Sequence, residues 1–352
     1  MEIWSFDYEF SIKLQLGRYV MPFPLIVLIP TVLGGLFGVG KTIEAAVNNS
    51  DADEINNNAE ELVKNAEEAR DSGRNACNYG LKSYGEKKLS IIDKEIRDFI
   101  SIFSRLKNVS IEHSPELERL NVGDFTEVSL QSLKHSCSFA DDFAVSAAAG
   151  AGAGAITAFG AYGGTMMLAS AGTGTAIGTL SGAAATNATL AWLGGGTLAA
   201  GGYGIAGGTL VLGSLVAGPA LLVLGSILGA QASKKLDEAR ANLEKARTFE
   251  AEVKVVLEKL KAILEVTDVG WKLLEDLRSR LYDSNVALRE LTKIFGVDYS
   301  TYPNGAKDSI FMAVKYAQLT KLVIDTPILS EDGSLAEGVL FNFNGVKECL
   351  EK

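Results

Sequence analysis

The sequence predicts a mainly α-helical protein, a bundle of long helices with a glycine-rich apolar insert. Residues 143–233 run for 91 positions without a charged side chain or a histidine, and 22 of these positions are glycine. The other 261 residues carry all 76 charged side chains. In these flanks apolar residues recur at three- and four-residue spacing, which is typical of amphipathic helices. Because a folded surface must be solvated, an uncharged stretch of this length indicates a protein core or a bilayer.

The composition argues against several classes of function. A net charge of −10 disfavours a nucleic-acid partner and gives no sign of a basic membrane-binding patch. The three cysteines lie far apart without CxxC spacing, so neither a disulfide framework nor a zinc site is predicted. The histidines, His113 and His135, have no second ligand at metal-binding spacing. No nucleophile, base and orienting acid can be assembled, so we predict no enzyme activity, cofactor, metal or small-molecule substrate.

Residues 1–20 are predicted to form an amphipathic strand. Large apolar side chains alternate with polar ones from Trp4 to Leu16, which is the period of a strand. A lone strand is not stable, so this one would pair with another strand or pack on the body or on a neighbouring subunit. Acidic residues precede the first apolar run, unlike a secretion signal, so we expect a protein that is cytoplasmic as synthesised. A second interpretation takes Met21 as the natural start.

Residues 21–41 form an apolar segment of about transmembrane length. It is interrupted by Pro22, Pro24 and Pro30, and the last of these would kink a helix. We interpret the segment as a membrane-associating or buried helix rather than a regular membrane span.

The end of this segment also matches a phosphate-binding loop. Gly35, Gly40, Lys41 and Thr42 fit the pattern GxxxxGK[ST], and the apolar LVID run at 322–325 resembles a strand that ends in a magnesium-binding aspartate. A true phosphate loop needs a strand directly before its first glycine and a sheet around it, and the sequence predicts neither. The other interpretation is a helix that ends at the membrane edge, with the lysine extending towards lipid headgroups. A P-loop NTPase is therefore the less favoured alternative.

Residues 42–142 are predicted to form the first part of the helical bundle. A helical pattern runs from about residue 51 to residue 106, and Gly73 and Gly80 are points where it would break or bend. Beyond it the pattern is less regular, with short helices expected after Pro115 and at 126–139.

Residues 234–324 are predicted to form the second part of the bundle. Apolar positions from Leu236 to Ile263 advance by threes and fours, nearly the coiled-coil spacing, and the resulting helix is expected to pack antiparallel against the helix near residues 85–106. Two further helices are expected, at 272–295 and 309–324. The final residues, 325–352, are predicted to form a small hairpin and a tail, because Asp332 and Gly333 supply turn chemistry between short apolar runs.

Glycines recur four residues apart within the insert, residues 143–233, and therefore return to nearly the same helix face. Such a face lets two backbones approach closely, and this packing drives helix association in lipid. Asn187 and Trp192 would add a hydrogen bond between helices and an interface marker. The residues predicted to pack in the membrane or between subunits are Gly150, Gly154, Gly160, Gly164, Gly174, Gly178, Gly182, Asn187, Trp192, Gly204, Gly208, Gly225 and Gly229.

The number of membrane crossings in the insert is expected to be about two to four. Residues 209–230 are the most hydrophobic candidate, and residues 143–169 are a second one. An alternative interpretation is that alanine and glycine fill a tightly packed soluble core, although 91 consecutive residues are many for the available cover. Low-complexity disorder is disfavoured because leucine, isoleucine, valine and tryptophan are frequent.

Two phrases carry a resemblance to known proteins. The stretch AAATNATLAWLGGGTLAAGG, within residues 183–202, together with DTPILSEDG at 325–333, resembles a bacterial family of uncharacterised glycine-rich proteins. In architecture, long helices around an apolar glycine-rich insert are similar to the α-helical pore-forming toxins of the cytolysin A kind and to apolipoprotein L proteins. The architectural resemblance implies a concealed helical hairpin that unfolds into a membrane.

These observations predict an oligomerising membrane-inserting protein that permeabilises or remodels a lipid bilayer through its glycine-rich helical insert. Its expected partners are a lipid membrane and further copies of the same chain, and it would be membrane-associated when active. The main alternative is a soluble structural self-assembly protein, a cage or a filament, in which the insert serves only for subunit packing.

Overall fold

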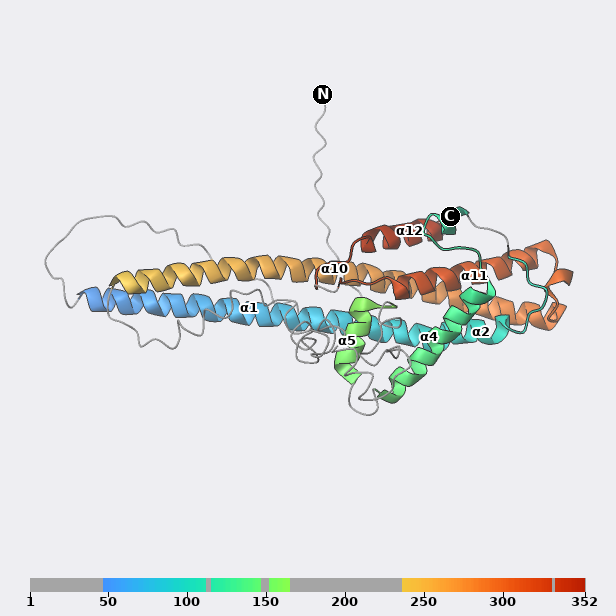
Figure 1. The fold of residues 1–352 in the computed structure, drawn as a ribbon, viewed down its shortest axis with the longest axis horizontal. Coiled ribbons are helices and arrows are strands. Elements are labelled where there is room, and N and C mark those ends of the chain that lie inside the picture. Colours follow the sequence, from blue (N-terminus) through green and yellow to red (C-terminus); the bar gives the residue numbers. More distant parts are fainter. Residues whose placement is uncertain (1–46, 112–114, 147–151, 165–235, 331–332, 352) are drawn as a thin grey trace, which may run out of the picture. The chain divides into compact units, whose positions relative to one another are not determined.

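The computed structural model describes residues 47–111, 115–146, 152–164, 236–330 and 333–351, all of which belong to one compact unit, Ala45–Lys352 (Figure 1). Of the described residues, 84% are helical and none lies in a regular strand, which confirms the mainly α-helical fold class. The strand expected at 1–20 and the apolar segment expected at 21–41 lie outside the described residues.

Two long helices, α1 (Val47–Ile91) and α10 (Leu236–Phe295), lie side by side and run parallel (Figure 1). Their polar contacts fix the direction, because the partners advance together along both chains. Asn242 hydrogen-bonds Asn56, Lys87 pairs with Glu275, and the Asn285 amide donates to the Glu95 carbonyl at 2.8 Å. The antiparallel pairing expected from the sequence is therefore wrong. Residues near 85–106 contact the second half of α10, whereas the first half of α10 lies beside the beginning of α1.

Glycine does not interrupt either long helix, contrary to the sequence prediction. Gly73 and Gly80 lie inside α1, and Gly270 lies inside α10, which is one helix rather than two. A Cβ atom at Gly73 would lie 2.7 Å from Leu257 Cδ2, and one at Gly80 would lie 2.7 Å from Leu264 Cδ2. Each glycine thus leaves space for a leucine of the partner helix, and this packing maintains the helix despite glycine's low intrinsic propensity.

The helical path continues beyond α1 through a π-helical turn, η1 (Ile92–Ile96), into α2 (Arg97–Phe103). A π-turn leaves backbone groups without their usual α-helical partners. Two side chains reach carbonyls of this turn. The Asn285 amide donates to the Glu95 carbonyl, and the Cys137 thiol contacts, at 3.7 Å, the Ile92 carbonyl that also accepts from the Arg97 N–H. The turn therefore also attaches α10 and α4 to the end of α1.

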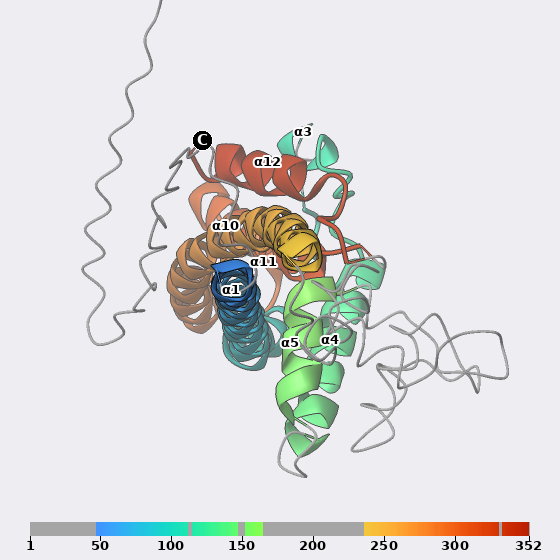
Figure 2. The same cartoon turned by 90° about the vertical axis from the view of Figure 1, so that its left-hand side faces the viewer.

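The remaining helices surround this end of the pair. They are α3 (Pro115–Glu118), α4 (Glu127–Ser146), α5 (Gly152–Tyr162), the 3₁₀ turn η6 (Tyr299–Thr301), α11 (Asn304–Asp325) and α12 (Val339–Glu351). Helix α12 packs on α10 and α11, whereas α5 packs on α1 at the opposite side (Figure 2). The larger hydrophobic core forms among these helices. Near the beginning of α1 a separate core cluster has six buried members: Ala59, Val63, Ala66, Ala246, Phe249 and Val253.

The predicted C-terminal hairpin is wrong. A single antiparallel bridge joins Leu329 and Leu335, and the apolar residues that follow it belong to α12. Within α12 the buried side chains are Val339, Phe343, Val346, Cys349 and Leu350. Their spacing of three and four residues is the helical period, which outweighs the local turn signal that suggested a second strand.

Candidate functional site

The described part of the glycine-rich insert comprises residues 143–146 at the end of α4, helix α5 and the turn that follows α5. Of the predicted packing residues, Gly154 lies in α5, and Gly160 and Gly164 lie in or just after its last turn. The others lie outside the described residues: Gly150, Gly174, Gly178, Gly182, Asn187, Trp192, Gly204, Gly208, Gly225 and Gly229. The phosphate-loop residues of the NTPase alternative, Gly35, Gly40, Lys41 and Thr42, also lie outside them.

Helix α5 contacts α1 backbone to backbone. A Cβ atom at Gly160 would overlap the carbonyl oxygen of Leu81, and one at Gly85 would overlap the carbonyl oxygen of Ile156. Two helices reach this separation only where both lack side chains at the crossing point. Gly160 therefore packs closely against a helix of the same chain, whereas Gly164, four residues later, lies beyond α5 and faces Asp325. Packing of these glycines in a membrane or between subunits stays a prediction. We refer to the contact between α1 and α5, formed by Leu81, Gly85, Ile156 and Gly160, as the α1–α5 crossing.

The C-terminal end of α5 is held by the turn that follows it and by groups from two other parts of the chain. The last carbonyls of a helix have no partner within it. Here the backbone N–H of Gly163, in the left-handed conformation at φ +52°, donates to the Phe159 carbonyl at 2.9 Å. The Lys88 amine donates to the Gly160 carbonyl at 3.4 Å. The N–H groups of residues 328 and 329 donate to the Ala161 carbonyl at 2.7 and 3.1 Å. The glycine-rich segment thus leaves the described body at a helix end whose last carbonyls have hydrogen-bond partners.

Lys88 is the least expected residue of this site, because its side chain is fully buried. Its amine lies 4.3 Å from the centroid of the Tyr84 ring and 5.7 Å from that of the Phe159 ring, where it can make cation–π interactions. Burial lowers the pKa of the amine from 10.5 to about 7, and the nearby carboxylate of Asp325 partly opposes this lowering. A positive charge here also lies at the negative end of the α5 dipole.

Asp325 is the last residue of α11, and its carboxylate faces the end of α5. One oxygen, Oδ2, accepts a hydrogen bond from Lys321. The other, Oδ1, is buried without a hydrogen-bond partner among the described residues, and a Cβ atom at Gly164 would overlap it. Residues 322–325, which resembled a strand with a magnesium-binding aspartate, form the last turn of a helix. The NTPase alternative therefore has a helix at 322–325 where it requires a strand.

The sequence contained a signal for Lys88 that periodicity alone did not identify. Leu81, Tyr84, Lys88 and Ile91 follow one another at spacings of three, four and three residues, and all four are buried. A lysine in register with an apolar stripe is buried only when other groups satisfy its amine. In this fold they come from α5 and α11, far away in the sequence. We refer to Tyr84, Lys88, Gly160, Gly163 and Asp325 as the α5 docking site.

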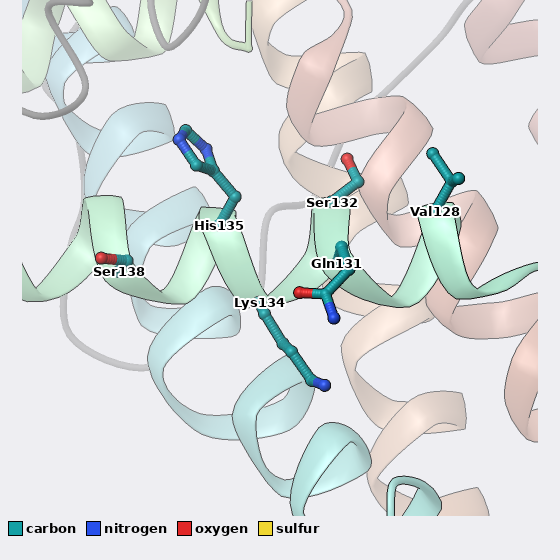
Figure 3. A pocket seen from close by; sticks show the side chains of 6 residues that line it. All are labelled: Val128, Gln131, Ser132, Lys134, His135 and Ser138. Atoms are coloured by element: carbon teal, nitrogen blue, oxygen red, sulfur yellow. The ribbon is translucent and has the colours of Figure 1, made fainter.

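A shallow pocket on α4 is a second candidate. Its volume is about 580 Å³, and its described lining comes from one helix: Val128, Gln131, Ser132, Lys134, His135 and Ser138 (Figure 3). The labelled side chains leave the helix in different directions and do not converge on one point (Figure 3). His135 has no second metal ligand beside it, and within the described ranges no group of three or more histidine, cysteine or acidic residues could hold a metal ion. The pocket therefore offers no chemistry comparable to that of the α5 docking site.

Comparison with protein-family models, curated proteins and solved structures finds no match for this chain. In the part of the chain that the structure describes, no helix is both long enough and apolar enough to cross a membrane.

Proposed function

We propose that this protein is an oligomerising membrane-inserting protein that permeabilises or remodels a lipid bilayer through its glycine-rich segment. The observation that carries the proposal is the 91-residue stretch, 143–233, without a charge or a histidine. In this proposal the helical body is synthesised in the cytoplasm and keeps the beginning of the segment docked until a membrane is available. Several chains then associate through glycine faces, which are self-complementary.

The docking of α5 supports a stored form of this kind. Residues 157–164, which belong to the uncharged stretch, are buried against the body. The α1–α5 crossing covers the glycine face of α5, which would otherwise be exposed to water. In water, glycine makes a helix less stable. Docking therefore gives the first part of the segment a partner before any lipid is encountered.

The points at which the glycine-rich segment leaves and re-enters the body determine which movements membrane insertion would require. The segment leaves the body beside Lys88 and returns at α10, whose first half contacts Asn56. These two points are 32 residues apart on α1, which corresponds to about 48 Å of helix. The two ends of a helical hairpin lie side by side, about 8–10 Å apart. A compact membrane hairpin would thus require release of α5, separation of the beginnings of α1 and α10, or both.

Liposome flotation and dye release by the purified full chain test the proposal. The expected result is leakage that increases steeply with protein concentration, because association precedes insertion. Absence of both binding and leakage across acidic and neutral pH, with anionic and neutral lipids, would refute it.

A triple variant, Gly174→Leu with Gly178→Leu and Gly182→Leu, is expected to abolish leakage while the helical body stays folded by circular dichroism. The matched control replaces the same three glycines with alanine, which keeps the face small and should retain most of the leakage. Equal leakage from the leucine and alanine variants would remove the glycine-packing argument.

A soluble self-assembly protein is the second candidate, and the α1–α5 crossing favours it specifically. That crossing is a glycine–glycine helix contact within the protein, so close packing of this segment does not by itself require lipid. Light scattering and negative-stain imaging without lipid separate the two candidates. A stable cage or filament that leaves liposomes intact would support self-assembly and contradict membrane insertion.

A further inference from the structure

The α5 docking site places an ionisable group where α5 meets the rest of the fold. Lys88 belongs to α1, Asp325 ends α11, and the carbonyl that accepts from Lys88 belongs to Gly160 of α5. A Cβ atom at Gly163 would lie 3.1 Å from the Lys88 amine. Three helices thus meet at one amine, so its charge acts directly on the contact between α5 and the body.

We infer that Lys88 is the sensing residue of a pH-sensitive switch that determines whether α5 stays docked on α1 and α11. In the docked state the ring of Phe159 and the end of α5 cover the amine. When α5 leaves, that ring and the Gly160 carbonyl leave with it. The amine is then open to water on this side, and the released form holds a proton more tightly than the docked form.

The sign of the effect follows from the two pKa values. Burial in the docked form lowers the pKa of Lys88 from 10.5 to about 7, against the opposing influence of Asp325. Release restores an ordinary value, so α5 takes up a proton on leaving whenever the pH lies between these limits. Acidification from about pH 10.5 to about pH 7 therefore favours release. Below about pH 7 the effect levels off, because the amine is protonated in both forms.

The other ionisable groups near this amine lie on α1, α11 and α5. Tyr84 of α1 faces the amine with its ring, and burial raises the pKa of its phenol, so it stays neutral near pH 7. Asp325 of α11 is paired with Lys321 of the same helix. Helix α5 contributes no acidic or basic side chain, since residues 152–162 contain none, and its one ionisable residue is the buried Tyr162. Among these groups, Lys88 is the one whose pKa is moved into the neutral range.

The switch would provide the trigger for the proposed membrane insertion. Only this biological role rests on the proposed function. The test of the switch contains no lipid. A failure of the switch therefore leaves membrane insertion standing, and a failure of membrane insertion leaves the switch standing.

Hydrogen exchange of the full-length wild-type chain, followed by mass spectrometry at pH 6, 7 and 8, tests the switch. Exchange rates are divided by the intrinsic rate at each pH, which gives the opening constant of α5. From the two pKa values, this constant should rise about fivefold from pH 8 to pH 7 and only about twofold from pH 7 to pH 6. Peptides in the middle of α10 serve as the internal reference and should change much less.

Two variants isolate Lys88. Lys88→Met keeps the apolar length of the side chain without an ionisable group, and its α5 opening constant should not vary between pH 6 and pH 8. Lys82→Met is the matched control, because Lys82 lies six residues earlier on α1 and pairs with Glu86 at 3.4 Å on the surface. This control should retain the wild-type profile.

A flat wild-type profile, or the same profile in Lys88→Met, would overturn the inference. An equal change in α5 and in the α10 reference would overturn it too, because the whole fold rather than α5 would then be opening. The wild-type profile decides the question even if Lys88→Met does not fold.

Discussion

Helix α1 uses glycine in two different ways along its length. At Gly73 and Gly80 the neighbours are leucine side-chain ends of α10, whereas at Gly85 the neighbour is the backbone of α5. The end of a leucine side chain can move aside by rotating about its torsions, but a backbone carbonyl moves only if its whole helix moves. The α1–α10 contact is therefore tolerant of an added methyl group, and the α1–α5 crossing is not. On the same helix, glycine thus makes space for a leucine side chain of α10 in one place and allows the backbone of α5 to approach closely in the other.

The largest effect is expected from Gly160→Ala at the α1–α5 crossing. The added Cβ would overlap the Leu81 carbonyl oxygen, so α5 must move away from α1. We expect a loss of about 3 kcal/mol of stability, at the upper end for overpacking, and loss of hydrogen-exchange protection in α5. Urea denaturation and hydrogen exchange measure the two quantities. A variant with unchanged α5 protection would contradict the backbone contact.

A smaller effect is expected from Gly163→Ala in the turn after α5. This residue has φ +52°, and a Cβ atom would lie 2.5 Å from the Ile324 carbonyl oxygen. Conformation and contact together should cost about 2 kcal/mol. Gly296→Ala is the matched control, because Gly296 has φ +77° and no atom within 4 Å of the added Cβ. The control should cost only about 1 kcal/mol, the conformational part. Equal midpoints of urea unfolding for the two variants would show that the contact with Ile324 adds nothing.

The helices that the sequence predicts correctly follow from the local spacing of apolar residues. The helical flanks are confirmed, and the helix expected at 309–324 corresponds to α11, Asn304–Asp325. The direction of the α1–α10 pair was not predictable in this way, because an apolar stripe packs equally well against a parallel or an antiparallel partner. The relative direction of two helices depends on how the chain between them runs. The spacing of apolar residues within each helix carries no information about that.

The candidate site was only partly visible in the sequence, for a related reason. Gly160 was identified from its four-residue spacing, but its partner Gly85 was not, since that contact joins residues 75 positions apart. In the NTPase alternative Asp325 would bind magnesium at the end of a strand, whereas it ends a helix. The LVID run is too short to distinguish a strand from a helix end. The burial of Lys88 could be predicted only by knowing which helices cover it. Chemistry assembled from three distant helices is a property of the tertiary structure.

The smallest effect is expected from Gly80→Ala in the α1–α10 contact. The added Cβ would lie 2.7 Å from Leu264 Cδ2, so this leucine must change its side-chain torsions. Against this cost, alanine favours the helix over glycine by about 1 kcal/mol. We expect the two contributions to offset each other to within about 1 kcal/mol, with α5 protection unchanged. Urea denaturation beside Gly160→Ala measures the contrast, since both variants add one methyl group to a helix. If Gly80→Ala were as destabilising as Gly160→Ala, the distinction between a yielding side chain and a fixed backbone would fail.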